Sequence, residues 1–228
     1  MNCTKGLTVH RKRELILGSS FVVIATLAFV FGWTNLFTVK SVSVSGAPNS
    51  QISKQVLQIA DINNGEKLAR IEPRNIASKL ALAGIDWIEN VKVSRNWVSR
   101  EVVINISARN AVAISGTQYI DQGGVLFTSP IELKAKLPEI NAKDGSSRSA
   151  AVALFLALPT EIRNKVTAVS ASSGNNFQLI INEKLKINWG SDANSEVKLR
   201  IYKALIALPE NKKITQMDLS DPTKPTVK

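Results

Sequence analysis

The residues of this chain that could perform chemistry are few, and most are poorly placed for catalysis. His10 is the only histidine and Cys3 the only cysteine among 228 residues, and both precede a long apolar segment. A Ser-His-Asp triad, a Cys-His pair and a histidine-bound zinc are therefore excluded beyond that segment. The sequence predicts no catalytic residue, no metal site and no cofactor site in the main body of the chain.

Three weaker patterns could suggest an enzyme. Ser195 and Lys198 have the S-x-x-K spacing of penicillin-recognising enzymes, but no plausible Lys-Thr-Gly partner follows, and the pair is better interpreted as the start of an amphipathic helix. Asp218 and Asp221 could be imagined as glycosidase carboxylates, but carboxylates near a terminal strand are usually solvated turn residues. Asp121 stands before two glycines, which favours turn chemistry over calcium ligation.

The apolar segment predicts the membrane topology of the chain. Residues 15–39 contain no charge, and a helix of that length spans roughly 37 Å, enough to cross a hydrocarbon core of about 30 Å. Basic residues precede the segment, which predicts a cytoplasmic tail at 1–14, a transmembrane helix at 15–37 and an extracytoplasmic remainder, a single-pass type II topology. A cleaved signal peptide is the alternative, but the segment ends in bulky residues with no Ala-x-Ala pattern.

Charge and cysteine content narrow the function further. Residues 38–228 hold 25 Lys and Arg against 17 Asp and Glu, a net charge of +8. Such a surface favours anionic surroundings, such as lipid headgroups or acidic wall polymers. Nucleic acid is an improbable partner for an exported region. With Cys3 on the cytoplasmic side, no disulfide can form outside, so apolar cores must hold one or two ordinary domains.

The first exported block has the pattern of a small α+β unit. Val42 and Val44 alternate with serines in a short strand that stops at Gly46. A helix capped by Asn49 or Ser50 follows, and a second helix begins at Pro73 and stops at Gly84. Alternating apolar residues then predict two strands, around 91–94 and 102–108. The expected order is strand, helix, helix, strand, strand.

The second block is richer in strands. Paired glycines favour a hairpin over 119–127, and strict alternation predicts another over 177–189, with its turn at 182–184. Helices are expected over 149–158 and 194–208. In the second helix a buried face is predicted for Val197, Ile201, Leu205 and Leu208, and an outward position for Lys198, Arg200 and Lys203.

The last expected strand runs over 214–219. Pro222 and Pro225 follow it, and proline cannot donate to a sheet ladder. The sequence therefore predicts that this strand forms an unoccupied sheet edge. The alternative is a proline-containing tail that folds back and protects the edge.

In order and spacing, these elements resemble the FtsQ/DivIB family of bacterial cell-division proteins. Val42-Ser43-Val44-Ser45-Gly46 is similar to the V-x-V-x-G opening of POTRA domains, and residues 88–97 to the V-x-x-A-x-V-x-R-x-W-P signature. The hairpin at 119–127, Leu137-Pro138 and Met217-Asp218-Leu219 continue the resemblance. Val98 stands where the family usually has a proline after the tryptophan. Of the family's Glu-Arg-x-Pro motif, this chain has only the arginine, Arg109.

The resemblance implies a POTRA domain at 38–109, a mixed, sheet-rich β domain with flanking helices at 110–221 and a C-terminal tail at 222–228. It also implies a non-catalytic divisome scaffold at the septal membrane. Its terminal edge would recruit an FtsB-like and FtsL-like pair, and its POTRA domain and membrane helix would contact other division proteins. The partner-binding residues implied are Gln216, Met217, Asp218, Leu219, Ser220 and Asp221. A membrane-anchored cell-wall enzyme or a ligand sensor is the alternative function.

Overall fold

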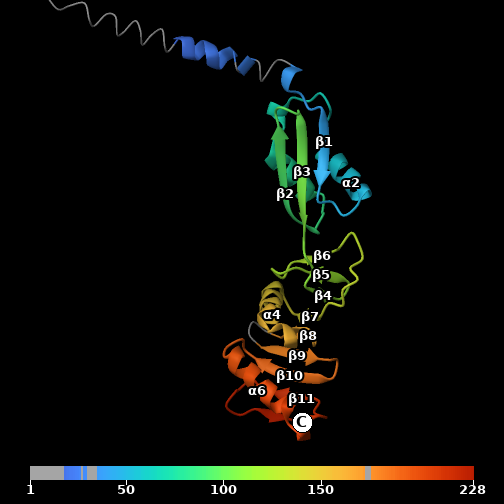
Figure 1. Cartoon of the computed structure of the whole chain (residues 1–228), viewed down its shortest axis with the longest axis vertical. Helices are drawn as coiled ribbons and strands as arrows, with labels where there is room; N and C mark the ends of the chain where they lie inside the picture. The colour runs from blue at the N-terminus through green and yellow to red at the C-terminus, as the bar shows by residue number, and fades with distance from the viewer. Residues whose placement is uncertain (1–17, 27, 30–34, 173–175) are drawn as a thin grey trace, which may run out of the picture. The chain divides into compact units, whose positions relative to one another are not determined.

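The computed structural model describes residues 18–26, 28–29, 35–172 and 176–228 (Figure 1). The predicted cytoplasmic tail at 1–14, with Cys3 and His10, lies outside the described residues, as do residues 15–17, 27 and 30–34 of the predicted transmembrane helix at 15–37. Residues 18–26 and 28–29 are helical. Within the described ranges, no helix has both the length and the apolar character needed to cross a membrane. The chain divides into two compact units, one ending at Ala108 and one beginning at Arg109.

The first unit has the predicted order of elements, preceded by a short 3-10 helix. Its three strands form one sheet in the order β1-β3-β2, with β1 parallel and β2 antiparallel to the central β3. The elements are η1 (Asn35–Phe37), β1 (Ser41–Ser45), α2 (Ser50–Ala60), η2 (Leu68–Arg70), α3 (Pro73–Leu82), β2 (Ile88–Asn96) and β3 (Glu101–Ala108). This sequence of strand, helix, helix, strand, strand confirms the predicted POTRA-like topology.

Two amphipathic helices cover one face of this sheet. Asn49 begins α2 by accepting a hydrogen bond at its side chain from the Ile52 N–H, 2.9 Å away. Apolar residues at helical spacing then bury against the alternating apolar residues of β3. The buried side chains include Ile52, Val56, Ile76, Leu80, Val102, Ile104 and Ile106. Burying each of these side chains contributes about 1.5–3 kcal/mol, so this single layer holds the unit without a disulfide.

Gly46 ends β1 where no other residue fits. Its φ of +84° lies in the left-handed region, and a Cβ there would lie 2.0 Å from the carbonyl oxygen of Ile106 on β3. The glycine of the V-x-V-x-G pattern is thus required both by the backbone conformation and by the neighbouring strand.

Arg95 and Trp97, the Arg-x-Trp part of the motif in the first unit, hold neighbouring segments together. The Arg95 Nη1 donates to the carbonyl oxygens of Leu68 (3.2 Å) and Ile71 (2.9 Å), which fastens the loop between the two helices to β2. The guanidinium carbon also lies 5.6 Å from the centroid of the Trp97 ring. The Trp97 ring in turn meets Phe37 edge to face at 5.9 Å.

The second unit is built on one mixed sheet of nine strands, in the order β12-β11-β10-β9-β8-β7-β4-β5-β6. Its strands are β4 (Ala113–Ser115), β5 (Gln118–Ile120), β6 (Leu126–Phe127), β7 (Glu139–Ala142), β8 (Val166–Ala171), β9 (Phe177–Ile181), β10 (Leu185–Gly190), β11 (Gln216–Asp218) and β12 (Thr226–Val227). The two predicted hairpins are confirmed as β5–β6 and β9–β10, both antiparallel. The sheet-rich character predicted for this region is also confirmed.

The turn between β5 and β6 uses Asp121 as predicted. One carboxylate oxygen of Asp121 accepts hydrogen bonds from the N–H groups of Gly123 (2.9 Å) and Val125 (2.8 Å). The other carboxylate oxygen pairs with the guanidinium of Arg109. The two hydrogen bonds to Gly123 and Val125 confirm the predicted role of Asp121 in the turn.

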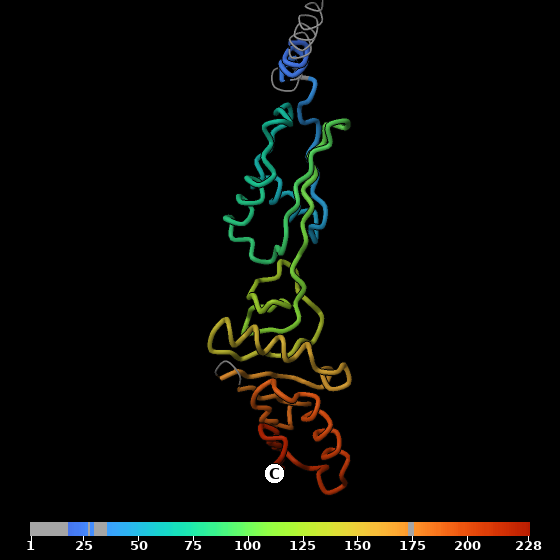
Figure 2. Tube along the Cα trace, turned by 90° about the vertical axis from the view of Figure 1, so that its left-hand side faces the viewer, coloured from blue at the N-terminus to red at the C-terminus, as the bar shows by residue number. Residues whose placement is uncertain are grey.

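Among the residues that the structure describes, the helices of the second unit cover one face of the large sheet. They are α4 (Gly145–Ala157), α5 (Thr160–Arg163) and α6 (Ser195–Ala207), followed by η3 (Pro209–Asn211). In Figure 1, α4 and α6 lie on the same side of the sheet, the side turned toward the viewer in Figure 2. Helix α4 begins four residues before the predicted start, because Asp144 caps it by accepting from the Ser147 N–H at 2.8 Å. Because the first turn of α4 is polar, the apolar periodicity of the sequence does not show where this helix begins.

Candidate partner-docking edge

The strand predicted to form an open edge is covered in the structure. Strand β11 pairs in parallel with β10 on its inner side, and β12 pairs antiparallel with its outer side. Met217 lies opposite Val227, and Asp218 lies opposite Thr226. The prediction of an unoccupied edge was therefore wrong, and the alternative of a tail that folds back is the one observed. The physical reason is that Pro222 and Pro225 occupy the return of the chain, whereas the paired residues come after them.

The six predicted partner-binding residues divide into two sets. The side chains of Met217 (2% exposed) and Leu219 (fully buried) point into the core under the helices. Gln216, Ser220 and Asp221 are exposed, and Asp218 is half-buried. Because side chains alternate along a strand, only Gln216 and Asp218 of β11 can present side chains on the open face.

Asp218 and Asp221 organise the chain as it leaves β11. Asp218 accepts from the Ser220 hydroxyl (2.6 Å) and N–H (2.9 Å), and also from the Asn188 side chain (3.0 Å). The Ser220 hydroxyl is the main reason that the pKa of Asp218 is lowered. Asp221 likewise accepts from the hydroxyl (2.7 Å) and N–H (2.9 Å) of Thr223, and its pKa is lowered mainly by that hydroxyl. Both carboxylates thus act as local turn acceptors.

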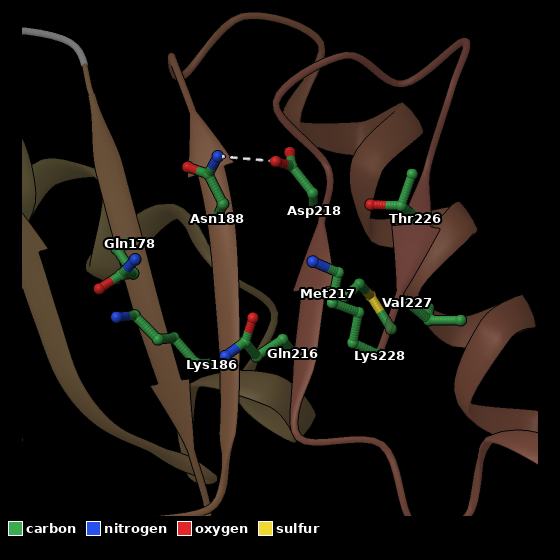
Figure 3. Close-up of a pocket in the computed structure, with 9 residues that line it drawn as sticks. All are labelled: Gln178, Lys186, Asn188, Gln216, Met217, Asp218, Thr226, Val227 and Lys228. Atoms are coloured by element: carbon green, nitrogen blue, oxygen red, sulfur yellow. Dashed lines mark hydrogen bonds between the residues drawn. The ribbon is translucent and has the colours of Figure 1, made fainter.

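The open face beside this edge holds a shallow cavity of about 250 Å³ (Figure 3). It extends across β9, β10, β11 and the covering strand, and most of its lining is polar. The lining residues are Gln178, Lys186, Asn188, Gln216, Met217, Asp218, Thr226, Val227 and Lys228. Figure 3 shows the Asn188 and Asp218 side chains joined by their hydrogen bond on this face.

A row of polar residues crosses the sheet in register with this cavity. Each residue pairs with the next on the neighbouring strand, from β7 to β12. The row is Asn141, Ser170, Gln178, Asn188, Asp218 and Thr226. Sequence reasoning missed this row because its members lie on six strands, and only the tertiary register aligns them. Alternation of polar and apolar residues in the β9–β10 hairpin was the one signal available.

Helix α6 differs from its prediction at Lys198. This residue was expected to face outward, but it is 1% exposed, and its Nζ donates to the carbonyl oxygens of Trp189 and Ser191, each at 2.8 Å. The stem of Lys198 reaches inward, and its ammonium finds backbone acceptors at the end of β10. Burial lowers the pKa of Lys198. The prediction for Leu208 also differs, since this residue was expected on the buried face but is exposed because the helix ends at Ala207.

The Ser195 and Lys198 pair does not form a nucleophile–base contact in the described structure. The Ser195 hydroxyl donates to the Asp192 carbonyl (2.6 Å) and accepts from the Trp189 indole N–H (3.3 Å). Both side chains are thereby used to fasten the loop between β10 and α6. Among the residues that the structure describes, no group of three or more His, Cys, Asp or Glu side chains could hold a metal ion.

Comparison with known families accounts for both units. The POTRA domain, FtsQ-type, matches residues 37–109, and the C-terminal domain of the cell division protein FtsQ/DivIB matches residues 108–220. Together with the strand order of the first unit and the mixed sheet of the second, these matches define a POTRA-bearing division protein. The chain belongs to the FtsQ/DivIB family of cell division proteins.

Curated relatives agree with this assignment. The chain is 27% identical to the cell division protein FtsQ of Mycolicibacterium smegmatis, over all of this chain and 67% of the relative. It is 25% identical to the FtsQ of Streptomyces bingchenggensis, over 97% of this chain and 88% of the relative. The FtsQ of Mycobacterium leprae is 28% identical, over 86% of this chain and 57% of the relative.

Proposed function

We propose that this division protein is a membrane-anchored, non-catalytic scaffold that captures an FtsB-like and FtsL-like pair at the β11 edge. In this proposal residues 1–14 are cytoplasmic, residues 15–37 cross the membrane, and a POTRA domain (38–109) and a β domain (110–221) lie outside. The POTRA domain and the membrane helix hold further septal proteins. The uncharged segment at 15–39 and the basic residues before it support this topology.

The observation that carries the proposed docking site is the form of the β11 edge. Strand β11 is the last strand of the sheet before a covering strand of only two residues. A partner strand at β11 would gain main-chain hydrogen bonds, and alternate side chains would supply specificity. Gln216 and Asp218 would offer the partner both their side chains and their outward backbone groups, whereas the Met217 and Leu219 side chains are buried and the Leu219 N–H donates to Asn188 on β10.

Burial of Met217 rules out the simplest mutational test. Met217→Pro would disturb the core as well as the edge, because the side chain is 2% exposed. A contact test that leaves the fold intact is a photo-crosslinking residue at Gln216, which is exposed. Asn141 on β7 is a matched control, because it is also exposed on the same face but lies four strands away from β11.

The experiment uses the full chain in lipid nanodiscs with FtsB-like and FtsL-like proteins from the same bacterium. We expect a crosslink from position 216 to the FtsB-like protein, and at least about tenfold less from position 141, because crosslinking requires direct contact at the edge. Equal crosslinking from both positions would contradict the edge site. Failure of the pair to co-purify with the folded, uncrosslinked chain would contradict the scaffold function itself.

A further inference from the structure

The residues that cover β11 form a very short attachment. We call residues 222–228 the tail strand segment. Gln216 donates to the Lys228 carbonyl (3.1 Å), and Lys228 donates back to the Gln216 carbonyl (3.0 Å). The Lys228 carbonyl also accepts from the Thr215 N–H at 2.8 Å. By the alternation of antiparallel ladders, Asp218 and Thr226 form the next hydrogen-bonded pair.

The outer edge of the tail strand segment is a poor template for another strand. Thr226 and Lys228 direct their backbone groups toward β11, so Val227 directs its N–H and C=O outward. The next outward position is Pro225, which has no N–H to donate. Of these two outward positions, only Val227 has an N–H to donate to an added strand.

The edge beneath the tail strand segment is better suited to a partner. Removal of that segment would free the N–H and C=O groups of Gln216 and Asp218, two donors and two acceptors on one straight strand. It would also open the position of Val227, which packs partly buried against the core cluster opposite Met217. Asp218 and the polar cavity would lie beside the new strand.

We propose that partner binding at this edge is a strand exchange, in which a partner strand displaces the tail strand segment and takes its place against β11. This inference rests on the proposed scaffold function and defines the partner's chemistry. The partner strand runs antiparallel to β11 and carries a β-branched apolar residue at the Val227 position. Polar residues flank it, and the one opposite Asp218 carries a donor, as the Thr226 hydroxyl does now.

The exchange predicts an alternating pattern of amide hydrogen exchange in the free chain. Amides of Gln216 and Asp218 depend on the tail strand segment, whereas the Leu219 amide donates to the Asn188 carbonyl on β10 at 2.8 Å. Local opening of the segment should make the first two exchange at least about tenfold faster than Leu219. Equal protection of all three amides would overturn the proposal, because the segment would then open only with the sheet.

A reversible lock tests the exchange directly. Gln216 and Lys228 form a hydrogen-bonded antiparallel pair, whose typical Cα separation of about 5.5 Å suits a disulfide. The variant is Gln216→Cys with Lys228→Cys in a full chain that also carries Cys3→Ser, and Gln216→Cys alone is the control. The assay is capture of the FtsB-like and FtsL-like pair in nanodiscs.

The outcomes separate the exchange from the scaffold function. We expect the oxidised double variant to lose at least about tenfold in affinity, the reduced form and the single variant to bind, and removal of residues 222–228 to strengthen binding. Binding by the oxidised variant equal to that of the reduced one would overturn the exchange and leave the scaffold intact. Weaker binding after removal of the segment would also overturn it. Absence of binding in every folded form would overturn the scaffold function.

Discussion

In each unit a cation near a tryptophan ring fastens a loop by donating to two backbone carbonyls, and the two cations differ in how far they are buried. Arg95 in the first unit donates to two backbone carbonyls and lies 5.6 Å from the Trp97 ring centroid. Lys198 in the second unit also donates to two carbonyls and lies 5.8 Å from the Trp189 ring centroid. Arg95 is half-buried, whereas Lys198 is 1% exposed.

The difference in burial should determine how much stability is lost when the cation is removed. At Arg95, the donor side chain is itself half-buried, so its removal opens the space beside the Leu68 and Ile71 carbonyls toward solvent, although both of those residues are buried. At Lys198, removal would take the donor from the carbonyls of Trp189, which is buried, and Ser191, which is half-buried. Leaving one buried group unsatisfied costs about 1–3 kcal/mol. Burial, more than the number of hydrogen bonds, should therefore determine the stability effect.

The largest expected effect is that of Lys198→Met. We expect a loss of about 1–3 kcal/mol in the free energy of unfolding, measured by urea denaturation of the full chain, because the Trp189 and Ser191 carbonyls lose their donor. Lys203→Met on the same helix is the control, since Lys203 forms only an exposed pair with Glu161. It should change stability by less than about 0.5 kcal/mol. Equal effects of the two variants would show that the buried ammonium contributes nothing.

A smaller effect is expected for Arg95. Arg95→Met should cost about 1 kcal/mol, because Arg95 is half-buried and water entering from its exposed side can take over part of the hydrogen bonding of the guanidinium. Arg95→Lys should recover part of this loss, since an ammonium can still reach one carbonyl. The same denaturation measurement applies. A loss for Arg95→Met as large as that for Lys198→Met would break the comparison, because burial would then not separate the two cations.

The pH dependence of Lys198 sharpens the comparison. Burial lowers the pKa of Lys198 below its usual 10.5, so the unfolded chain holds this proton at pH values where the folded chain has released it. Stability contributed by this residue therefore rises as the pH increases toward 10.5. We expect the difference in unfolding free energy between the unsubstituted chain and Lys198→Met to widen over that range. A difference that does not change with pH would contradict a lowered pKa.

The smallest effect is expected at Asp218, whose lowered pKa depends on the hydroxyl of the exposed Ser220. The Ser220 hydroxyl lowers the pKa of Asp218 below its usual value of 3.8, so its contribution is present above 3.8 and is lost as the pH falls through the lowered pKa. Ser220→Ala should move that pKa back toward 3.8, as followed by NMR titration of the carboxyl. Thr223→Ala is the control, because Thr223 bonds Asp221 instead. An unchanged pKa in Ser220→Ala would contradict this role of the hydroxyl.

Local signals were sufficient for most of the fold. Gly46, Asn49 and Pro73 mark element ends through backbone conformation and capping, which are local properties, so the first unit was predicted correctly. The hairpins of the second unit were predicted for the same reason. Strands β4, β7, β8 and β12 were not predicted. Strands β4, β7 and β12 are short, and the pairing of β7 with β4 and β8 joins segments that are distant in sequence.

The candidate site was only partly predictable. Residues 216–221 could be selected from their pattern and from the family resemblance, but the burial of Met217 and Leu219 and the cover over the edge could not. Lys198 shows the same limit, because a helical wheel assigns a lysine to solvent unless acceptors on another strand are known. In both cases the missing information is the identity of a neighbour far along the chain.

The sequence by itself determined the periodicity and the ends of the elements, because helix caps, turns and alternation depend on adjacent residues. It also contained the uncharged segment at 15–39 and the order of motifs typical of one protein family. Only the tertiary structure decided which strand covers β11, which polar residues align across the sheet and which cation is buried. These features depend on register between distant segments, and register is set by packing of the whole core.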